Sequence, residues 1–278
     1  MVKRKIRAEG IRFGTELRRI RLNAGLTQGQ LARAVNVSTS LVSCFERGTH
    51  WPRRDVAEAL DRTTRASGQL VRLWVELSNR QAYPDWLGEL VEAEPQATLI
   101  RDYAPLAVPG LLQTEEYART VIEAANSLAT PRQIDELVAG RMRRQRIWEA
   151  AEPPVMMTVI AESVLTSPIG GPVVMNSQLD HLISQVEKHR IRLQVVPADT
   201  RLHPGLAGMF ILLSIRDRAD VLYVESAVSG TMIHEPAQVQ RMSMLFGDLQ
   251  AVALSPERSL SRLNEIRRQF RGTPEAVA

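Results

Sequence analysis

The 278-residue sequence has a single cysteine, Cys44, and no apolar run close to the ~18 residues that a membrane-spanning helix requires. One thiol excludes an internal disulfide framework and is typical of a protein from a reducing compartment. The basic start of the chain is not followed by the apolar segment of a signal peptide. We therefore expect a cytoplasmic protein that does not bind a membrane.

The sequence also lacks the patterns of common catalytic and metal sites. It contains no G-x-S-x-G, no H-E-x-x-H, no glycine loop that would cradle phosphates and no cluster of cysteine and histidine ligands. His181 and His189 are eight positions apart and could share a helix face, but no third ligand accompanies them. The sequence thus predicts no enzyme activity, no metal and no cofactor.

What is present is the composition of a globular protein, with 44% apolar and 24% charged residues over a length that suggests two domains. The charge is unevenly distributed. Residues 1–80 hold 16 lysines and arginines against seven acidic residues, whereas the remainder holds 19 against 24. The excess of basic residues in 1–80 suggests that this segment binds a polyanion. A basic face exposed only to solvent would show the same excess.

The first eighty residues have the periodicity of five short amphipathic helices. Thr27 and Gln30 have the spacing of a capping box before the second helix, Ser38 stands as the N-cap of the third, and Gly48 ends the third. Apolar positions indicate the five helices: Phe13, Leu17 and Ile20; Leu31 and Val35; Val42 and Phe45; Val56 and Leu60; Leu70, Leu73, Trp74 and Leu77. Two short helices joined by a tight turn form a helix-turn-helix, whose second helix enters the major groove of DNA.

Hydroxyl side chains lie along one side of the third predicted helix. Thr39, Ser40 and Ser43 are opposite its apolar positions, where small side chains allow a close approach and offer donors and acceptors to base edges. Arg53 and Arg54 follow this helix and are candidates for phosphate contacts, although each also fits an ordinary solvated surface.

The stretch "LRRIRLNAGLTQGQLARAVNVSTSLVSCFERG" resembles the Cro/CI-type (XRE-like) helix-turn-helix of phage repressors and bacterial regulators, across about residues 12–75. The resemblance implies that Gln28 contacts a backbone phosphate, where capping alone is the alternative, and that Arg21 and Glu46 form a structural ion pair. It also implies that Cys44 faces the DNA at a position where the family often has arginine, lysine or glutamine, so that a strong guanine contact is missing. The predicted DNA-binding residues are Gln28, Ser38, Thr39, Ser40, Ser43, Cys44, Arg53 and Arg54.

The pattern changes around Pro84, so we place a junction near 79–86, between a DNA-binding domain at 1–80 and a regulatory domain at 81–278. Helices are predicted over 85–94, after Thr114 as N-cap, over 131–150, and over 174–188, 236–247 and 257–271. Short β-rich runs are "VMMTVIAES", "IRLQVVP", "GMFILLS" and "DVLYVES". The predicted fold is a mainly α five-helix domain, then a helical segment at 85–150 and an α+β part at 153–271, with an antiparallel or mixed sheet.

The second part also resembles a family, the actinobacterial antitoxin-like regulators of the WhiJ and AbaA type. The stretches that carry the resemblance are "YPDWLGELVEAEPQATLIRDYAPLAVPGLLQTEEYA", "RMRRQRIW" and "AESVLTSPIGGPVVMNSQLDHLISQ". The resemblance implies a transcriptional regulator whose C-terminal domain is engaged by a small partner protein that adjusts DNA binding. It assigns a role to no single residue of this domain.

The loop "PADTRLHPGLAG" brings Asp199, Arg201 and His203 close together in sequence, as a candidate partner or ligand contact or as an ordinary surface loop. The sequence predicts a sequence-specific regulator of transcription, a repressor, that binds double-stranded DNA as a homodimer. Its half-sites would be about 34 Å apart or a multiple of this. One alternative is a repressor with a small-molecule pocket in the C-terminal domain, and another is an enzyme tethered to DNA.

Overall fold

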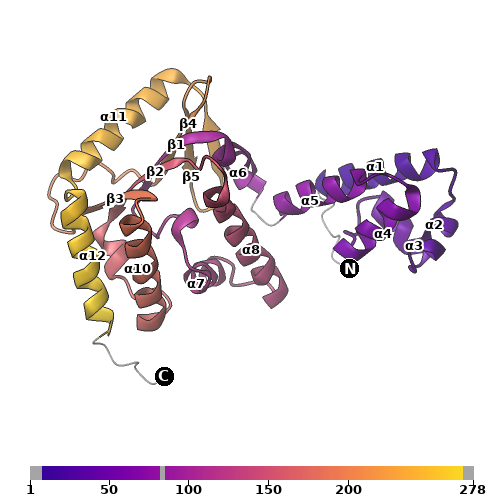
Figure 1. Ribbon diagram of the computed structural model, residues 1–278, viewed down its shortest axis with the longest axis horizontal. Helices are drawn as coiled ribbons and strands as arrows, with labels where there is room; N and C mark the ends of the chain where they lie inside the picture. Colours follow the sequence, from indigo (N-terminus) through magenta and orange to yellow (C-terminus); the bar gives the residue numbers. More distant parts are fainter. Residues whose placement is uncertain (1–7, 82–84, 272–278) are drawn as a thin grey trace. The chain divides into compact units, whose positions relative to one another are not determined.

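The computed structural model describes residues 8–81 and 85–271, in two compact units that divide between Asp85 and Trp86 (Figure 1). Each unit contains its own hydrophobic core. The predicted junction, 79–86, includes residues 82–84, which lie outside the described residues.

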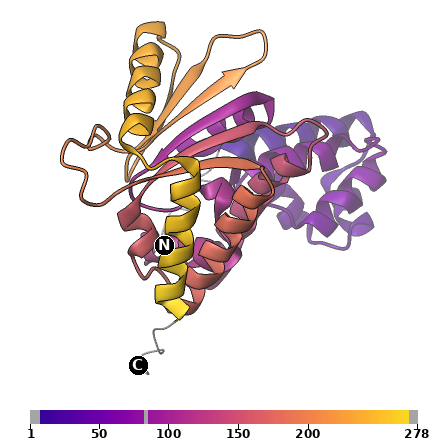
Figure 2. The ribbon, with the colours of Figure 1, turned by 60° about the vertical axis from the view of Figure 1, so that its left-hand side comes forward.

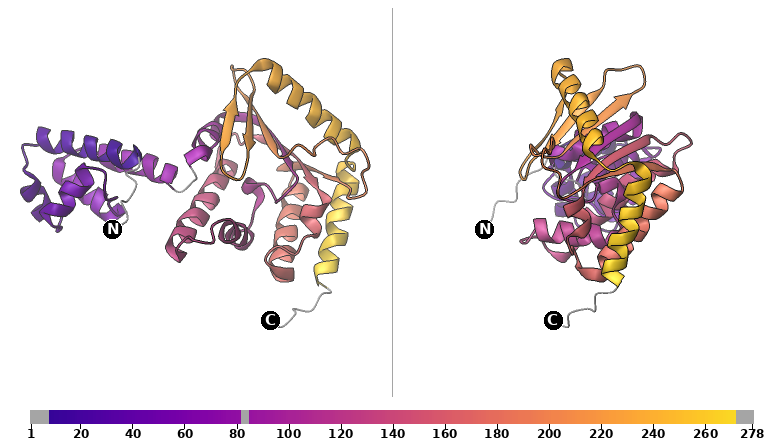
Figure 3. Two further views of the ribbon diagram at one scale, coloured as in Figure 1. Left: turned by 180° about the vertical axis from the view of Figure 1, so that it is seen from behind. Right: turned by 90° about the vertical axis from the view of Figure 1, so that its left-hand side faces the viewer.

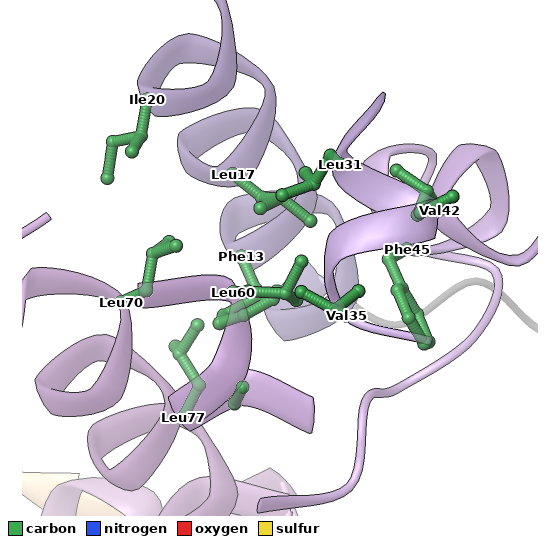
Figure 4. Packing of buried hydrophobic residues seen from close by; sticks show 12 residues of the cluster. Phe13, Leu17, Ile20, Leu31, Val35, Val42, Phe45, Leu60, Leu70 and Leu77 are labelled. Atoms are coloured by element: carbon green, nitrogen blue, oxygen red, sulfur yellow. The ribbon is translucent and has the colours of Figure 1, made fainter. Parts of the chain in front are cut away.

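The described part of the first unit, residues 8–81, consists of five helices, as predicted. They are α1 (Ala8–Asn23), α2 (Gln28–Ala34), α3 (Thr39–Glu46), α4 (Arg54–Thr64) and α5 (Gln69–Gln81). Figure 4 shows their apolar side chains gathered in one core, to which every helix contributes. Because none of these helices exceeds 16 residues, most of their stability comes from this shared core rather than from helix propensity.

Helix α1 crosses the C-terminal end of α3 at very short range. A Cβ atom added at Gly14 would lie 2.4 Å from the carbonyl oxygen of Phe45, and one added at Gly48 would lie 2.4 Å from the carbonyl carbon of Gly10. Gly48 also has a φ of +69°, in the left-handed region that favours glycine. The position of α3 is therefore fixed by backbone packing against α1.

The turn between α2 and α3 is tight. Asn36 adopts a φ of 54°, which asparagine tolerates better than most residues, and Ser38 then caps α3. The two helices and this turn form the predicted helix-turn-helix.

The second unit combines a six-stranded sheet with helices. Its strands are β1 (Ala97–Ala104), β2 (Val155–Ala161), β3 (Ile191–Val196), β4 (Phe210–Ile215), β5 (Val221–Glu225) and β6 (Gly230–Ile233). Its α-helices are α6 (Gly88–Ala93), α7 (Glu115–Ala125), α8 (Pro131–Arg144), α9 (Glu162–Thr166), α10 (Gly171–Glu187), α11 (Pro236–Val252) and α12 (Pro256–Arg271). Short 3₁₀ turns are η1 (Asp85–Leu87), η2 (Glu94–Gln96), η3 (Gly110–Leu112) and η4 (Gln145–Glu149).

The sheet is mixed, with the strand order β3-β2-β1-β4-β5-β6. Strands β1, β2 and β3 are parallel, and β4, β5 and β6 continue from β1 in antiparallel pairs. The predicted fold class is confirmed, but two strands were missed: β1 inside the segment expected to be helical, and the short edge strand β6.

Strand β1 escaped prediction because it carries charged residues in the middle of the sheet. Arg101 reaches Asp220 at 2.7 Å, and Asp102 is buried. Burial, together with the nearby carboxylate of Glu94, raises the pKa of Asp102 to about 7. Charged residues in sequence normally indicate solvent exposure, so the alternation of a strand was not visible here.

Helices cover the sheet on both faces (Figure 2). Helix α11 runs across one face from the β6 side to the β3 side, as the rear view in Figure 3 shows, and its Val239, Phe246 and Leu249 pack on residues of five strands. Helices α7, α8 and α10 lie on the other face, and α12 packs against α10. The edge strand β3 is closed by α12, because the backbone N–H of Val195 donates to Ser259 Oγ at 3.0 Å.

The sequence stretches that carry the second resemblance meet at the turn η3. Backbone carbonyls of this turn and of the adjoining Gln113 accept hydrogen bonds from three side chains: Gln145, Trp148 and Gln178. A buried ion pair lies in the same layer, where Arg144 contacts Glu94 at 2.5 and 3.0 Å. These residues hold segments distant in sequence together, so their distinctive pattern has a structural explanation.

Candidate nucleic-acid interface

Helix α3 is anchored at its start and along one side. The hydroxyl of Ser38 accepts a hydrogen bond from the backbone N–H of Leu41 at 3.2 Å, which caps the helix. Val42 and Phe45 are 0% and 3% exposed and point into the core (Figure 4). One face of α3 is thus committed to packing, and the other is available to a partner.

A buried ion pair fixes the far end of α3. Arg21 of α1 contacts Glu46 through Nε to Oε1 at 2.5 Å and through Nη2 to Oε2 at 3.1 Å, and the two side chains are 8% and 4% exposed. The hydrogen bond that Arg21 donates to Glu46 raises the pKa of Arg21 above its ordinary value, so the guanidinium stays charged. Arg21 Nη1 also donates to the carbonyl of Leu26 at 2.8 Å, which ties the α1–α2 turn to the same group.

Gln28 joins this arrangement. Its Nε2 donates to Glu46 Oε2 at 2.8 Å, so its side chain braces α2 against α3 in addition to standing at the start of α2. The predicted phosphate contact therefore cannot engage the whole amide group. One N–H of Nε2 remains for a phosphate, together with the backbone N–H groups at the first turn of α2.

The side of α3 opposite the core carries the predicted reading residues. Thr39 and Ser40 are exposed, and Ser43 and Cys44 are half-buried. Ser38 and Ser40 share a hydrogen bond between their hydroxyl oxygens at 2.9 Å. Among residues 8–81 no other helix covers this side, so a duplex groove can reach it.

Arg47, the C-cap of α3, was missed by the sequence reasoning. Its guanidinium donates to Ser43 Oγ, and its Nη2 lies 3.4 Å from Cys44 Sγ. The signal was available, since Arg47 follows Ser43 by four positions and Cys44 by three, the spacing of neighbours on one helix face.

Arg53 and Arg54 lie at the start of α4 and are exposed. Arg53 is 3.5 Å from Asp55, and Arg54 is 3.0 Å from Glu58. Exposed pairs of this kind contribute about 0–1 kcal/mol, so they can be exchanged for phosphate contacts at little cost. The structure thus leaves both arginines accessible, on a different helix from the hydroxyl residues.

The second unit separates the three residues predicted in the β3–β4 loop. His203 is held inward, where its Nδ1 accepts from the backbone N–H of Gly205 at 3.1 Å and its Nε2 lies 3.4 Å from the hydroxyl of Tyr103. Asp199 and Arg201 are exposed. Among the described residues, no hydrogen bond or ion pair joins the three, so they do not form one cluster.

Residues 12–74 match a family described as a helix-turn-helix domain, and residues 87–265 match the family described as "Domain of unknown function (DUF5753)". The chain belongs to the DUF5753 family. The helix-turn-helix match and the exposed face of α3 together identify this member as a DNA-binding regulator. No curated protein and no solved structure matches the sequence.

Residues 8–81 and 85–271 contain no group of three or more His, Cys, Asp or Glu side chains that could hold a metal ion. The suggestion that His181 and His189 share a helix face is wrong, since α10 ends at Glu187 and His189 has a φ of 55°. Across those same two ranges, no helix combines the length and apolar character of a membrane span.

Proposed function

We propose that this regulator recognises specific DNA sequences by placing α3 in the major groove. The observation that carries the proposal is the exposed hydroxyl face of a helix held rigid by the Arg21–Glu46 pair and by its buried apolar side. A recognition helix needs a fixed orientation and an outer face that is exposed, so that base edges can replace water there. The anchored, exposed helix α3 fits these two requirements.

The proposed roles follow from position and chemistry. Thr39, Ser40, Ser43 and Cys44 face the base edges, where each good contact discriminates by roughly 1–3 kcal/mol. Phosphate contacts come from the first turn of α2 at Gln28 and from the arginines of α4, and they supply affinity that depends on salt rather than on sequence. Ser38 contributes by capping α3, which fixes the start of the helix. We assign no catalytic step to the chain.

We infer a homodimer as the active species. A single helix-turn-helix buries roughly 600–1,000 Å² on DNA, which leaves little selectivity in a genome. Two copies would bind a pseudo-palindrome whose half-sites are about 34 Å apart or a multiple of this. The weak base discrimination of each helix-turn-helix would then add to that of the other. In the proposal the regulatory domain predicted at 81–278 joins the copies and receives the regulatory signal.

For that signal we propose a small partner protein, as the resemblance to antitoxin-like regulators suggests. The supporting observation is the β3–β4 loop, in which Leu202 and Leu206 are 89% and 85% exposed beside the charged Asp199 and Arg201. Exposed apolar side chains rimmed by charges are typical of protein contacts. A small-molecule effector would instead bind in an enclosed pocket.

The DNA-binding proposal is tested by selecting preferred duplexes from a random pool with the full chain. We expect the double variant Thr39→Ala/Ser40→Ala to bind DNA with relaxed base preference and an unchanged thermal melting profile. Unchanged preference would remove these residues from the reading face. A wild-type chain that selects no sequence would overturn the proposal itself.

The partner proposal is tested with the full chain as bait in lysate of the organism that encodes it. We expect one small protein to be retained by the wild type, to be lost from Leu202→Glu/Leu206→Glu, and to change the Kd for the selected DNA when added back. Leu128→Glu is the matched control, because Leu128 is 99% exposed elsewhere in the same unit. Thermal stabilisation by a metabolite, without any retained protein, would favour the small-molecule alternative.

A further inference from the structure

The side of α3 that is proposed to face the bases, the reading face, consists of Thr39, Ser40, Ser43 and Cys44. No side chain of α3 itself supplies a cation to this face. The helix sequence TSLVSCFE contains no lysine or arginine, and its outer side offers hydroxyls and one thiol. A hydroxyl can donate or accept, so it bonds to several kinds of base edge and discriminates weakly between them. Guanine is read most strongly by the planar fork of an arginine, which spans its O6 and N7 atoms.

Arg47 supplies such a fork directly over this face. It is exposed, and it follows the last residue of α3 as the C-cap. Its Nη1 donates to Ser43 Oγ and its Nη2 lies 3.4 Å from Cys44 Sγ, so the guanidinium is folded back along the helix. Both nitrogens therefore lie above the two residues proposed to meet the bases, rather than away from α3.

The contacts that hold Arg47 are easy to exchange. Both of its acceptors are neutral, and the sulfur of Cys44 is a weak one. In the described part of the chain no carboxylate pairs with Arg47, whereas Arg53 and Arg54 each have an acidic neighbour. Turning toward a base thus breaks no ion pair at this position.

We infer that Arg47 is the guanine-reading residue of this interface, an inference that rests on the proposed function. When α3 enters the groove, the guanidinium leaves Ser43 and Cys44 and donates two N–H groups to O6 and N7 of one guanine in each half-site. The same movement frees the Ser43 hydroxyl for a neighbouring base or phosphate. Arg47 thereby supplies the guanine contact that is absent at Cys44.

The test compares full-length wild type with Arg47→Lys and Arg47→Gln on the selected operator. Lysine keeps the positive charge but lacks the planar fork, and glutamine prefers the N6 and N7 atoms of adenine. Each G·C pair of the operator is replaced in turn, and Kd is measured at one fixed salt concentration. Arg62→Lys, a change at an exposed arginine in the last turn of α4, is the matched control.

For the wild type and Arg62→Lys, we expect replacement of one G·C pair in each half-site to weaken binding by on the order of 5- to 100-fold. Arg47→Lys should lose discrimination at that pair only and retain its affinity for unrelated DNA. Arg47→Gln should shift the preference at the same position to A·T, a gain that misfolding cannot mimic.

Two results would overturn the inference, and they differ in what else they remove. In the first, Arg47→Lys and Arg47→Gln lose as much affinity as the wild type when each G·C pair is replaced. Arg47 would then lie on the phosphates or in solvent, and the proposed function would stand. Equal binding of all duplexes by the wild type would remove the proposed function and this inference together.

Discussion

Replacing Glu46 by alanine tests how the reading helix is held. Glu46 accepts hydrogen bonds from Arg21 and Gln28, and its side chain is only 4% exposed. Its removal leaves the guanidinium of Arg21, itself 8% exposed, without a counter-charge. Breaking a buried pair in this way typically costs about 3–5 kcal/mol. For a domain of this size, where 1 kcal/mol shifts the Tm by about 4–8 °C, we expect the first unit to melt at least ~12 °C lower.

Scanning calorimetry of the full chain measures this, with the transition of the second unit as the internal reference. Glu58→Ala is the matched control, since Glu58 makes an exposed pair with Arg54 that contributes about 0.3–0.5 kcal/mol. Replacing both partners, as Arg21→Met/Glu46→Leu, should restore much of the stability because no buried charge is left alone. A shift for Glu46→Ala no larger than for Glu58→Ala, or a double variant as unstable as the single one, would refute the reasoning. At temperatures where Glu46→Ala is folded, its preferred DNA sequence should be unchanged.

Two further predictions concern phosphates and pH. Alanine at Arg53 and Arg54 should weaken binding to all duplexes alike and reduce the slope of log Kd against log salt by about one per contact; a changed base preference would contradict a phosphate role. Because burial raises the pKa of Asp102 to about 7, the folded protein holds a proton that the unfolded chain releases, so this group's contribution to stability falls as the pH rises from about 4 to about 7. The total loss is on the order of 4 kcal/mol, and Asp102→Asn should remove it. Urea unfolding at about pH 5 and pH 8 should therefore show that the free energy of unfolding of Asp102→Asn, relative to that of the wild type, is greater at pH 8 than at pH 5. An equal difference at both pH values would show that Asp102 does not titrate in this range.

The first unit could be predicted closely because its signals are local. The capping pattern at Thr27, the cap at Ser38 and the apolar spacing of each helix operate within one or two turns. Glycine at position 48 indicated the end of α3 for the same reason, because a left-handed residue is needed there. These features depend on neighbours in sequence and need no knowledge of the rest of the fold.

The second unit was predicted less well because its pattern depends on distant partners. Arg101 and Asp102 stand inside a central strand. The charge of Arg101 is compensated by Asp220, whereas burial and the nearby Glu94 raise the pKa of Asp102. No local pattern reveals that such partners exist. The parallel pairing of β1 with β2 likewise joins segments more than fifty residues apart.

The sequence by itself therefore determined the helix-turn-helix, the hydroxyl residues of its third helix and the mixed class of the second domain. Only the tertiary structure decided that Gln28 braces Glu46 and that His203 turns inward to Tyr103. The physical reason is the same in each case. A side chain's type fixes which bonds it can form, but the fold fixes which partner comes within reach.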